Sequence, residues 1–218
     1  MNQKRMVLVF LMLSCIGLLS VQTVFSQSAP DINMNPNTLV LSRKLGDQML
    51  GFNAGVYLPL FTHNPNTGVI TPQIGDPDGM TLGGSGTLRW GAFLNSIMNL
   101  GLDLSWSFNF GPNDDLVSQF TPITARLSTY LRTGSFEFPI HVGVGLNVLS
   151  YKITTTLTPV VKLGVSGLYN ISPDWGFGLN LMYWWVPDIY GSSTETPPPA
   201  DTRFGNFLEI SLSAIYNF

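Results

Sequence analysis

The chain has 218 residues and a formal net charge of −3, and 44% of its residues are hydrophobic while only 11% are charged. Because an average soluble domain carries about 25% charged residues, this composition argues against an ordinary soluble protein. The acidic balance also argues against nucleic acid as a partner, since nucleic-acid-binding surfaces are basic.

The N-terminal segment has the pattern of a secretory signal peptide. Two basic residues precede an apolar run over residues 6–21, and Val24 and Ser26 occupy the small-residue positions of a cleavage site. We therefore predict a signal peptide over residues 1–26. The chain's one cysteine lies within it, so the predicted mature protein has no thiol for a disulfide or for a cysteine-ligated metal.

Residues 27–48 show no sustained alternation of apolar and polar side chains, and we interpret them as a loose N-terminal arm. From residue 49 to residue 218 the pattern changes. No apolar run there approaches the roughly 20 residues of a spanning helix. Instead, apolar and polar side chains alternate in eight segments, at about residues 50–61, 81–94, 98–110, 120–132, 136–149, 157–170, 175–186 and 202–218.

This alternation predicts strands with one apolar face, each long enough to cross a bilayer at a tilt. The clearest segment is 98–110, where six apolar side chains from Leu100 to Phe110 alternate with small or polar ones. Open sheet edges are not tolerated in lipid, so the strands must close on themselves. We predict an all-β fold, an eight-stranded antiparallel up-and-down transmembrane β-barrel over residues 49–218.

The predicted connections alternate in length. Long ones fall at about residues 62–80, 111–119, 150–156 and 188–201, and short ones fall at residues 95–97, 134–135 and 172–174. The pair Gly134-Ser135 suits a two-residue hairpin turn, which favours glycine first. Short turns at one end and longer loops at the other are typical of bacterial membrane barrels, with both termini at the short-turn end.

Alternation alone leaves open which face is outside, since a soluble lipocalin-like barrel would turn its apolar face inward. Two features favour an apolar exterior. The polar face is rich in glycine, serine and asparagine, which fit the narrow lumen of an eight-stranded barrel. Aromatic residues also gather at strand ends, as in membrane-interface girdles: Trp106, Phe108, Phe110, Tyr183 and Trp185 at one rim, and Trp90, Phe136, Tyr169, Trp175, Tyr216 and Phe218 at the other.

Seven charged residues within the strands are predicted to point into the lumen: Arg89, Asp103, Arg126, Arg132, Glu137, Lys162 and Glu209. Counting back from the short turns places Arg89 opposite Asp103, and Arg132 opposite Glu137. Buried charges need partners, so this network predicts a salt-bridged plug in preference to a selective path for ions. The inward Tyr57, Phe93, Tyr130, Leu168, Met182, Trp184 and Phe207 add apolar character to the same lumen.

The sequence predicts no catalytic residue. Ser128 and His141 fall opposite each other near Glu137, but all three face the lumen, so a structural hydrogen bond is the favoured interpretation over a hydrolase triad. His63 is isolated in a loop, and residues 75–79 lack the ligand number of a calcium loop. We therefore expect no metal, no cofactor and no enzymatic activity.

The segment that ends the chain resembles the terminal strand of bacterial outer-membrane β-barrels, since Leu208, Ile210, Leu212, Ala214, Tyr216 and Phe218 share one face. In that family this strand is the sorting signal read by the barrel-assembly machinery, which implies that role for Tyr216 and Phe218. From about Leu50 onward the chain is similar to the small OmpA-, OmpX- and OmpW-type barrels. The resemblance implies a location in the bacterial outer membrane, with residues 27–48 in the periplasm.

The resemblance leaves two functions open. The first is a structural or porin-like barrel in contact with outer-membrane lipids, with narrow passive conductance of small solutes, including hydrophobic ones. The alternative is a surface-exposed adhesin that binds host or matrix ligands through extracellular loops. Those loops are acidic and contain Asp76, Asp78, Asp114, Asp115, Asp188, Glu195 and Asp201.

Overall fold

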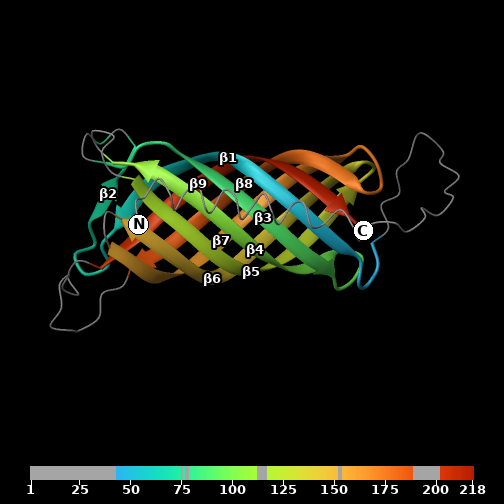
Figure 1. Ribbon diagram of the computed structural model, residues 1–218, viewed down its shortest axis with the longest axis horizontal. Helices are drawn as coiled ribbons and strands as arrows, with labels where there is room; N and C mark the ends of the chain where they lie inside the picture. Colours follow the sequence, from blue (N-terminus) through green and yellow to red (C-terminus); the bar gives the residue numbers. More distant parts are fainter. Residues whose placement is uncertain (1–42, 75, 77–78, 112–116, 152–153, 189–201) are drawn as a thin grey trace, which may run out of the picture. The chain divides into compact units, whose positions relative to one another are not determined.

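The computed structural model describes residues 43–74, 76, 79–111, 117–151, 154–188 and 202–218 (Figure 1). The predicted signal peptide and most of the predicted arm lie outside this range. The described chain forms nine strands: β1 (Gln48–His63), β2 (Ile70–Pro72), β3 (Gly83–Phe93), β4 (Met98–Phe110), β5 (Val117–Thr133), β6 (Phe136–Tyr151), β7 (Thr154–Asn170), β8 (Trp175–Asp188) and β9 (Arg203–Asn217).

Eight of these strands close into a barrel. Each strand from β4 to β9 pairs antiparallel with the strand that precedes it in the chain. β1 pairs antiparallel with both β3 and β9, which closes the ring. The closing ladder runs from Met49 opposite Asn217 to His63 opposite Phe204, with one irregularity between Pro59 and Phe61. The predicted eight-stranded antiparallel barrel is therefore confirmed.

Two features of the connections differ from the prediction. The short β2 lies within the predicted loop 62–80 and extends the sheet by pairing with Phe61–His63 of β1. The predicted long loop at 150–156 is wrong, because β6 continues to Tyr151 and β7 begins at Thr154. The apolar alternation stops near Leu149, yet Ser150 still pairs with Thr155. Threonine readily occupies strands, so these strands continue beyond their apolar part.

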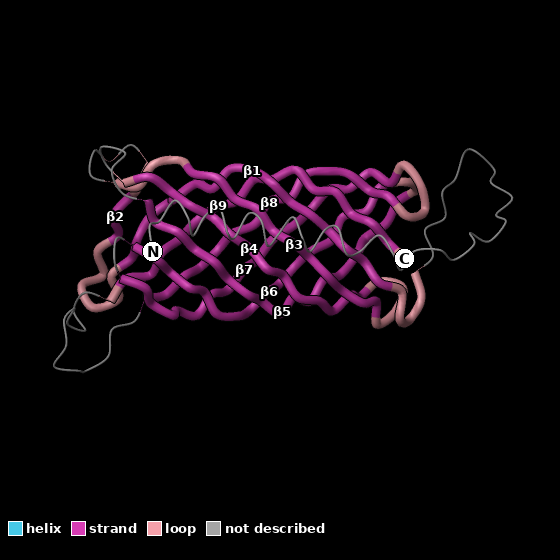
Figure 2. The backbone as a smooth tube through the Cα atoms, viewed as in Figure 1, coloured by secondary structure: helices cyan, strands magenta, loops and turns pink. Residues whose placement is uncertain are grey.

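The short turns lie together at one end of the barrel, which we call the short-turn end (Figure 2). Gly134 has a φ of +56°, as primed hairpin turns require at this position, and its flanking residues Thr133 and Phe136 are paired. Oδ1 of Asn95 accepts hydrogen bonds from the backbone N–H groups of Ile97 and Met98, at 2.9 and 2.8 Å. These local hydrogen bonds fix the hairpin registers that align the lumen side chains.

The barrel exterior is apolar. Large hydrophobic side chains on alternate positions are exposed on every barrel strand, including Phe52, Leu102, Ile123, Ile140, Val165, Leu179 and Leu212. A contiguous apolar surface of this extent is incompatible with water and typical of a lipid-facing wall. The serine, asparagine and charged side chains between them are buried, so the predicted orientation of the two faces is confirmed. Within the described residues, no helix has the length and apolarity needed to span a membrane.

Candidate functional site: a filled lumen

The lumen is packed in three layers of inward side chains. An apolar cluster of Met49, Phe93, Tyr130, Leu168 and Ile215 lies toward the short-turn end. A polar layer fills the middle of the barrel. A second apolar cluster lies toward the long-loop end and contains Tyr57, Phe120, Val160, Met182, Trp184, Val186 and Phe207. Every member of both clusters is at most 5% exposed.

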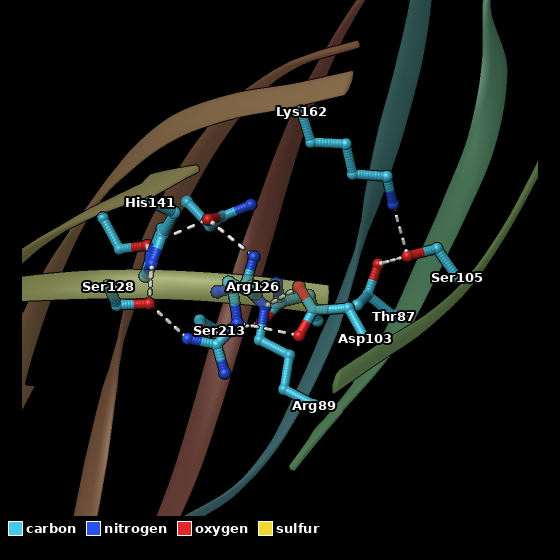
Figure 3. Close-up of polar contacts among 12 residues, drawn as sticks. Thr87, Arg89, Asp103, Ser105, Arg126, Ser128, His141, Lys162 and Ser213 are labelled. Atoms are coloured by element: carbon cyan, nitrogen blue, oxygen red, sulfur yellow. Dashed lines mark hydrogen bonds and ion pairs between the residues drawn. The ribbon is translucent and has the colours of Figure 1, made fainter. Parts of the chain in front are cut away.

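Asp103 is the anion at the centre of the polar layer (Figure 3). Its carboxylate lies 3.5 Å from Nε of Arg89 and accepts a hydrogen bond of 2.8 Å from Nε of Arg126. The predicted register of Arg89 with Asp103 is confirmed, and Arg126 reaches the same carboxylate from β5. All three side chains are at most 3% exposed, so one buried carboxylate neutralises part of the charge of two buried guanidinium groups.

A chain of hydrogen bonds continues around the wall from this carboxylate. Arg126 donates to Ser128, whose Oγ lies 2.8 Å from Nδ1 of His141, and Nε2 of His141 lies 3.0 Å from Oγ of Ser166. Ser166 in turn donates to Oδ1 of Asn180 at 2.9 Å. Because Ser166 uses its proton there, it accepts a hydrogen bond from His141, so Nε2 of His141 is the donor in this chain.

Asn180 links this chain to the second buried anion. Its amide nitrogen donates to Ser211 at 3.1 Å, and Ser211 donates to Glu209 at 2.8 Å. Trp184 Nε1 donates to the other Glu209 oxygen at 3.1 Å. Nζ of Lys162 lies 3.6 Å from the centroid of the same Trp184 ring and donates to Ser105 at 2.7 Å. The indole thus contacts a buried cation with its ring and a buried anion with its N–H group.

The remaining predicted pair closes the short-turn end. Arg132 donates to Glu137 at 2.6 Å, in the predicted register, and also to the Ser96 carbonyl. Its guanidinium carbon lies 5.7 Å from the centroid of the Phe93 ring. This pair is less enclosed than the central one, since the Arg132 side chain is 16% exposed.

Arg43 is a lumen residue that the sequence pattern does not indicate. Its guanidinium carbon lies 5.8 Å from the centroid of the Phe93 ring, and Nη1 donates to the Pro173 carbonyl at 3.2 Å. Burial lowers the pKa of the Arg43 guanidinium, and the Glu137 carboxylate opposes that effect. Arg43 lies in the predicted arm, where no alternation marks an inward position, so the only sequence signal was its charge next to the start of β1.

The aromatic cluster closes the other end of the lumen. Tyr57 stacks on Phe207 with ring centroids 5.0 Å apart, and it meets the edge of Trp184 at 4.8 Å. Phe120 packs against the same Phe207 ring at 4.9 Å. These rings come from four strands around the barrel, so together they span the lumen rather than line one wall.

The arrangement of Ser128, His141 and Glu137 does not form a hydrolase triad. Ser128 and His141 are hydrogen-bonded, but the other ring nitrogen contacts Ser166, while Glu137 is paired with Arg132. Ser128 and His141 are also buried. Among the described residues, no group of three or more His, Cys, Asp or Glu side chains is placed to hold a metal ion.

The two aromatic residues of the predicted sorting signal lie on the outer face of the barrel at the short-turn end. Tyr216 packs against Phe218 and Trp175, with ring centroids 5.9 and 5.0 Å apart. The Phe218 backbone pairs with Gln48 at the start of β1. These residues therefore form part of an outward aromatic patch beside the barrel seam.

Comparisons with known proteins agree with this architecture. A family model matches the chain over residues 31–216. The chain is 23% identical over 230 residues to an uncharacterized protein of Borreliella burgdorferi, with 96% of each chain covered. It is 28% identical over 177 residues to an uncharacterized protein of Treponema pallidum, covering 79% of this chain and 78% of that one. The crystal structure of Neisserial surface protein A has a similar fold, with a TM-score of 0.54 at 11% identity over 79% of this chain and 97% of that chain.

Proposed function

The chain belongs to the family whose model covers residues 31–216 and is an eight-stranded bacterial outer-membrane β-barrel, and from this premise we propose that it is a structural barrel with a closed lumen. In this proposal the barrel has at most a low passive conductance for small solutes. It acts through its outer surfaces rather than through a pore. We also propose that it is not an enzyme. The short-turn end of the barrel faces the periplasm. The predicted signal peptide and the predicted arm precede the barrel in the chain.

The observation that carries this proposal is the burial of the lumen. Side chains of both apolar clusters and of the central ion pairs are at most 5% exposed. A water-filled pore would leave its lining side chains exposed along the path. A path for hydrophobic solutes would also have to pass the polar layer, where Asp103 and Glu209 are buried and hydrogen-bonded.

Single-channel recording in a planar bilayer tests the closed lumen. The refolded protein is expected to give no resolved conductance steps. The matched variant carries Trp184→Ala and Phe207→Ala, which remove two rings of the aromatic cluster, and it should conduct more than the native barrel. Stable conductance steps of the native protein, unchanged in this variant, would contradict a closed lumen.

A second candidate function is adhesion through the extracellular loops, and the β1–β2 region favours it. Val69, Ile70 and Ile74 are each more than half exposed, in and around the short β2 at the long-loop end of the barrel. A cleft of about 410 Å³ lies beside them, lined by residues that include Leu58, Ile74, Met80 and Leu82. Exposed apolar side chains outside a membrane belt are typical of contact surfaces. Of the acidic residues predicted in these loops, five lie outside the described residues: Asp78, Asp114, Asp115, Glu195 and Asp201.

Replacing Val69, Ile70 and Ile74 together by serine tests adhesion. If these loops bind matrix ligands, binding of whole cells to immobilised fibronectin or laminin should fall, while the heat-modifiable mobility of the barrel stays unchanged. A variant of Ile171, an exposed apolar residue at the opposite end, serves as the control. Equal binding by cells carrying the native protein, the triple serine variant and the Ile171 variant would contradict a role for the β1–β2 region.

Topology is tested by epitope accessibility. An epitope inserted at Gly68, in the connection between β1 and β2, should be labelled on intact cells. An epitope at Ser172, in a short turn, should be labelled only after the outer membrane is opened. The reverse pattern would invert the barrel relative to the membrane.

The proposed role of Tyr216 and Phe218 predicts an assembly defect. Phe218→Ser should reduce insertion into the outer membrane, because it removes an aromatic side chain from the strand that resembles the sorting signal. The measurement is the amount of heat-modifiable protein in the outer-membrane fraction. Phe136→Ser, which removes an exposed aromatic residue from another strand at the same end, is the control. Equal insertion of both variants would show that Phe218 has no special role.

A further inference from the structure

The lipid-facing wall contains three glycines whose position on their strands points outward, and they differ in what covers them. Gly84 is opposite Phe108, and Gly86 is opposite Trp106. In each case the neighbouring ring occupies the place of the missing side chain. Gly167 on β7 is exposed, and a Cβ added there would meet nothing closer than the Phe138 ring at 3.8 Å. Gly167 therefore leaves an uncovered gap in the wall.

A groove of about 510 Å³ lies over this gap. Its sides are apolar side chains of β6, β7 and β8, including Phe138, Ile140, Val165, Leu179 and Leu181. Ser166 and Asn180 also border it, but their side chains are hydrogen-bonded to each other on the luminal side. The side chains of the groove thus offer an occupant van der Waals contact, and its two polar side chains are already hydrogen-bonded to each other.

The wall beneath the groove has an interrupted ladder. The β6–β7 pairing passes from Glu137 opposite Leu168 to Ile140 opposite Val165, without paired residues between them. Pro139 lies in this gap and has no N–H to donate to β7. An apolar occupant over Gly167 would shield the backbone of this interrupted stretch of the β6–β7 ladder.

We propose that this groove binds an acyl chain of a bilayer lipid. The groove is continuous with the exposed apolar belt, which is the surface that faces the hydrocarbon of the membrane. Its volume lies within the range of small-ligand sites. With no cationic residue at its border, it selects the chain of a lipid and not the headgroup. The site is independent of the lumen and of the proposed closed-lumen function.

Photo-crosslinking tests the site in vesicles of phosphatidylcholine that carry a diazirine on one acyl chain. After illumination, peptide mass spectrometry locates the crosslinks. We expect labelling at Phe138, Ile140 and Leu179 to exceed severalfold the labelling of equally exposed belt residues on β3 and β4. Gly167→Leu fills the groove, and it should remove this excess.

Ala92→Leu is the matched control, because it adds an apolar side chain to the outer face of β3, four strands away from β7 around the barrel. It should leave the excess labelling unchanged. Gly167→Ala, whose added methyl makes only an ordinary contact with Phe138, should give an intermediate loss and covers the case that the leucine variant fails to fold.

Uniform labelling of the belt in the native protein would overturn the proposal, as would an excess that both Gly167 variants retain. A native dimer, seen by protein–protein crosslinking and converted to a monomer by Gly167→Leu, would show instead that a second copy of the chain occupies the groove.

Discussion

Asp103→Asn is expected to destabilise the barrel by about 3–5 kcal/mol, the cost of leaving buried charge without its partner. The substitution keeps the shape of the side chain but removes the carboxylate that contacts Arg89 and Arg126, which are both buried. The measurement is guanidinium unfolding of the refolded protein in vesicles, followed by tryptophan fluorescence.

The control for Asp103 is Asp174→Asn, since Asp174 lies exposed in a short turn. Its free energy of unfolding should change by no more than about 0.5 kcal/mol. Adding Arg126→Met to Asp103→Asn should recover part of the loss, because one unpaired guanidinium is then removed. If Asp103→Asn lost no more stability than Asp174→Asn, water or an ion would have to compensate the charges of Arg89 and Arg126.

The second large effect is expected at the short-turn end, where Arg132→Ala should cost more than Glu137→Ala. Removing Arg132 leaves a carboxylate that is only 3% exposed. Removing Glu137 leaves a guanidinium that is more exposed and keeps the Ser96 carbonyl and the Phe93 ring as partners. The loss for Arg132→Ala should approach about 3 kcal/mol, the lower end for breaking a buried pair.

The double variant measures the coupling between these two side chains. It should lose less stability than the two single losses added together, by about 1–3 kcal/mol. Guanidinium unfolding of the four proteins provides the cycle. Additive losses of stability would show that Arg132 and Glu137 are solvated independently. This result would contradict the interpretation that the pair closes the short-turn end.

Much of the barrel was predictable because a strand in lipid has so few options. Alternation in a segment such as Met98–Phe110 fixes both the strand and its outward face, and a two-residue turn at Gly134-Ser135 fixes the register of Arg132 with Glu137. Short turns therefore predicted two charge pairs correctly. The continuation of β6 and β7 into Ser150 and Thr155 was not predictable in this way, because polar strand residues give no alternating signal.

The deeper contacts of the lumen depend on geometry that no local pattern contains. Arg126 shares the carboxylate of Asp103, although the register places Asp103 opposite Thr124. Lys162 on β7 reaches Ser105 on β4, across the interior of the barrel. Long side chains cross a narrow lumen diagonally, so their partners are set by the barrel's diameter and stagger. Arg43 was missed for a different reason, because it approaches the lumen from outside the strands.

The seam between β1 and β9 has a consequence for the order of assembly. These are the first and last strands of the barrel, and their ladder joins residues as far apart as Met49 and Asn217. Every other barrel pairing joins strands that are adjacent in the chain or separated only by β2. Any intermediate that lacks β9 therefore has two free edges, whose backbone groups hydrocarbon cannot satisfy. Insertion into the lipid core and closure of the ring must therefore occur together. A half-inserted sheet that adds the remaining strands one at a time would not be stable.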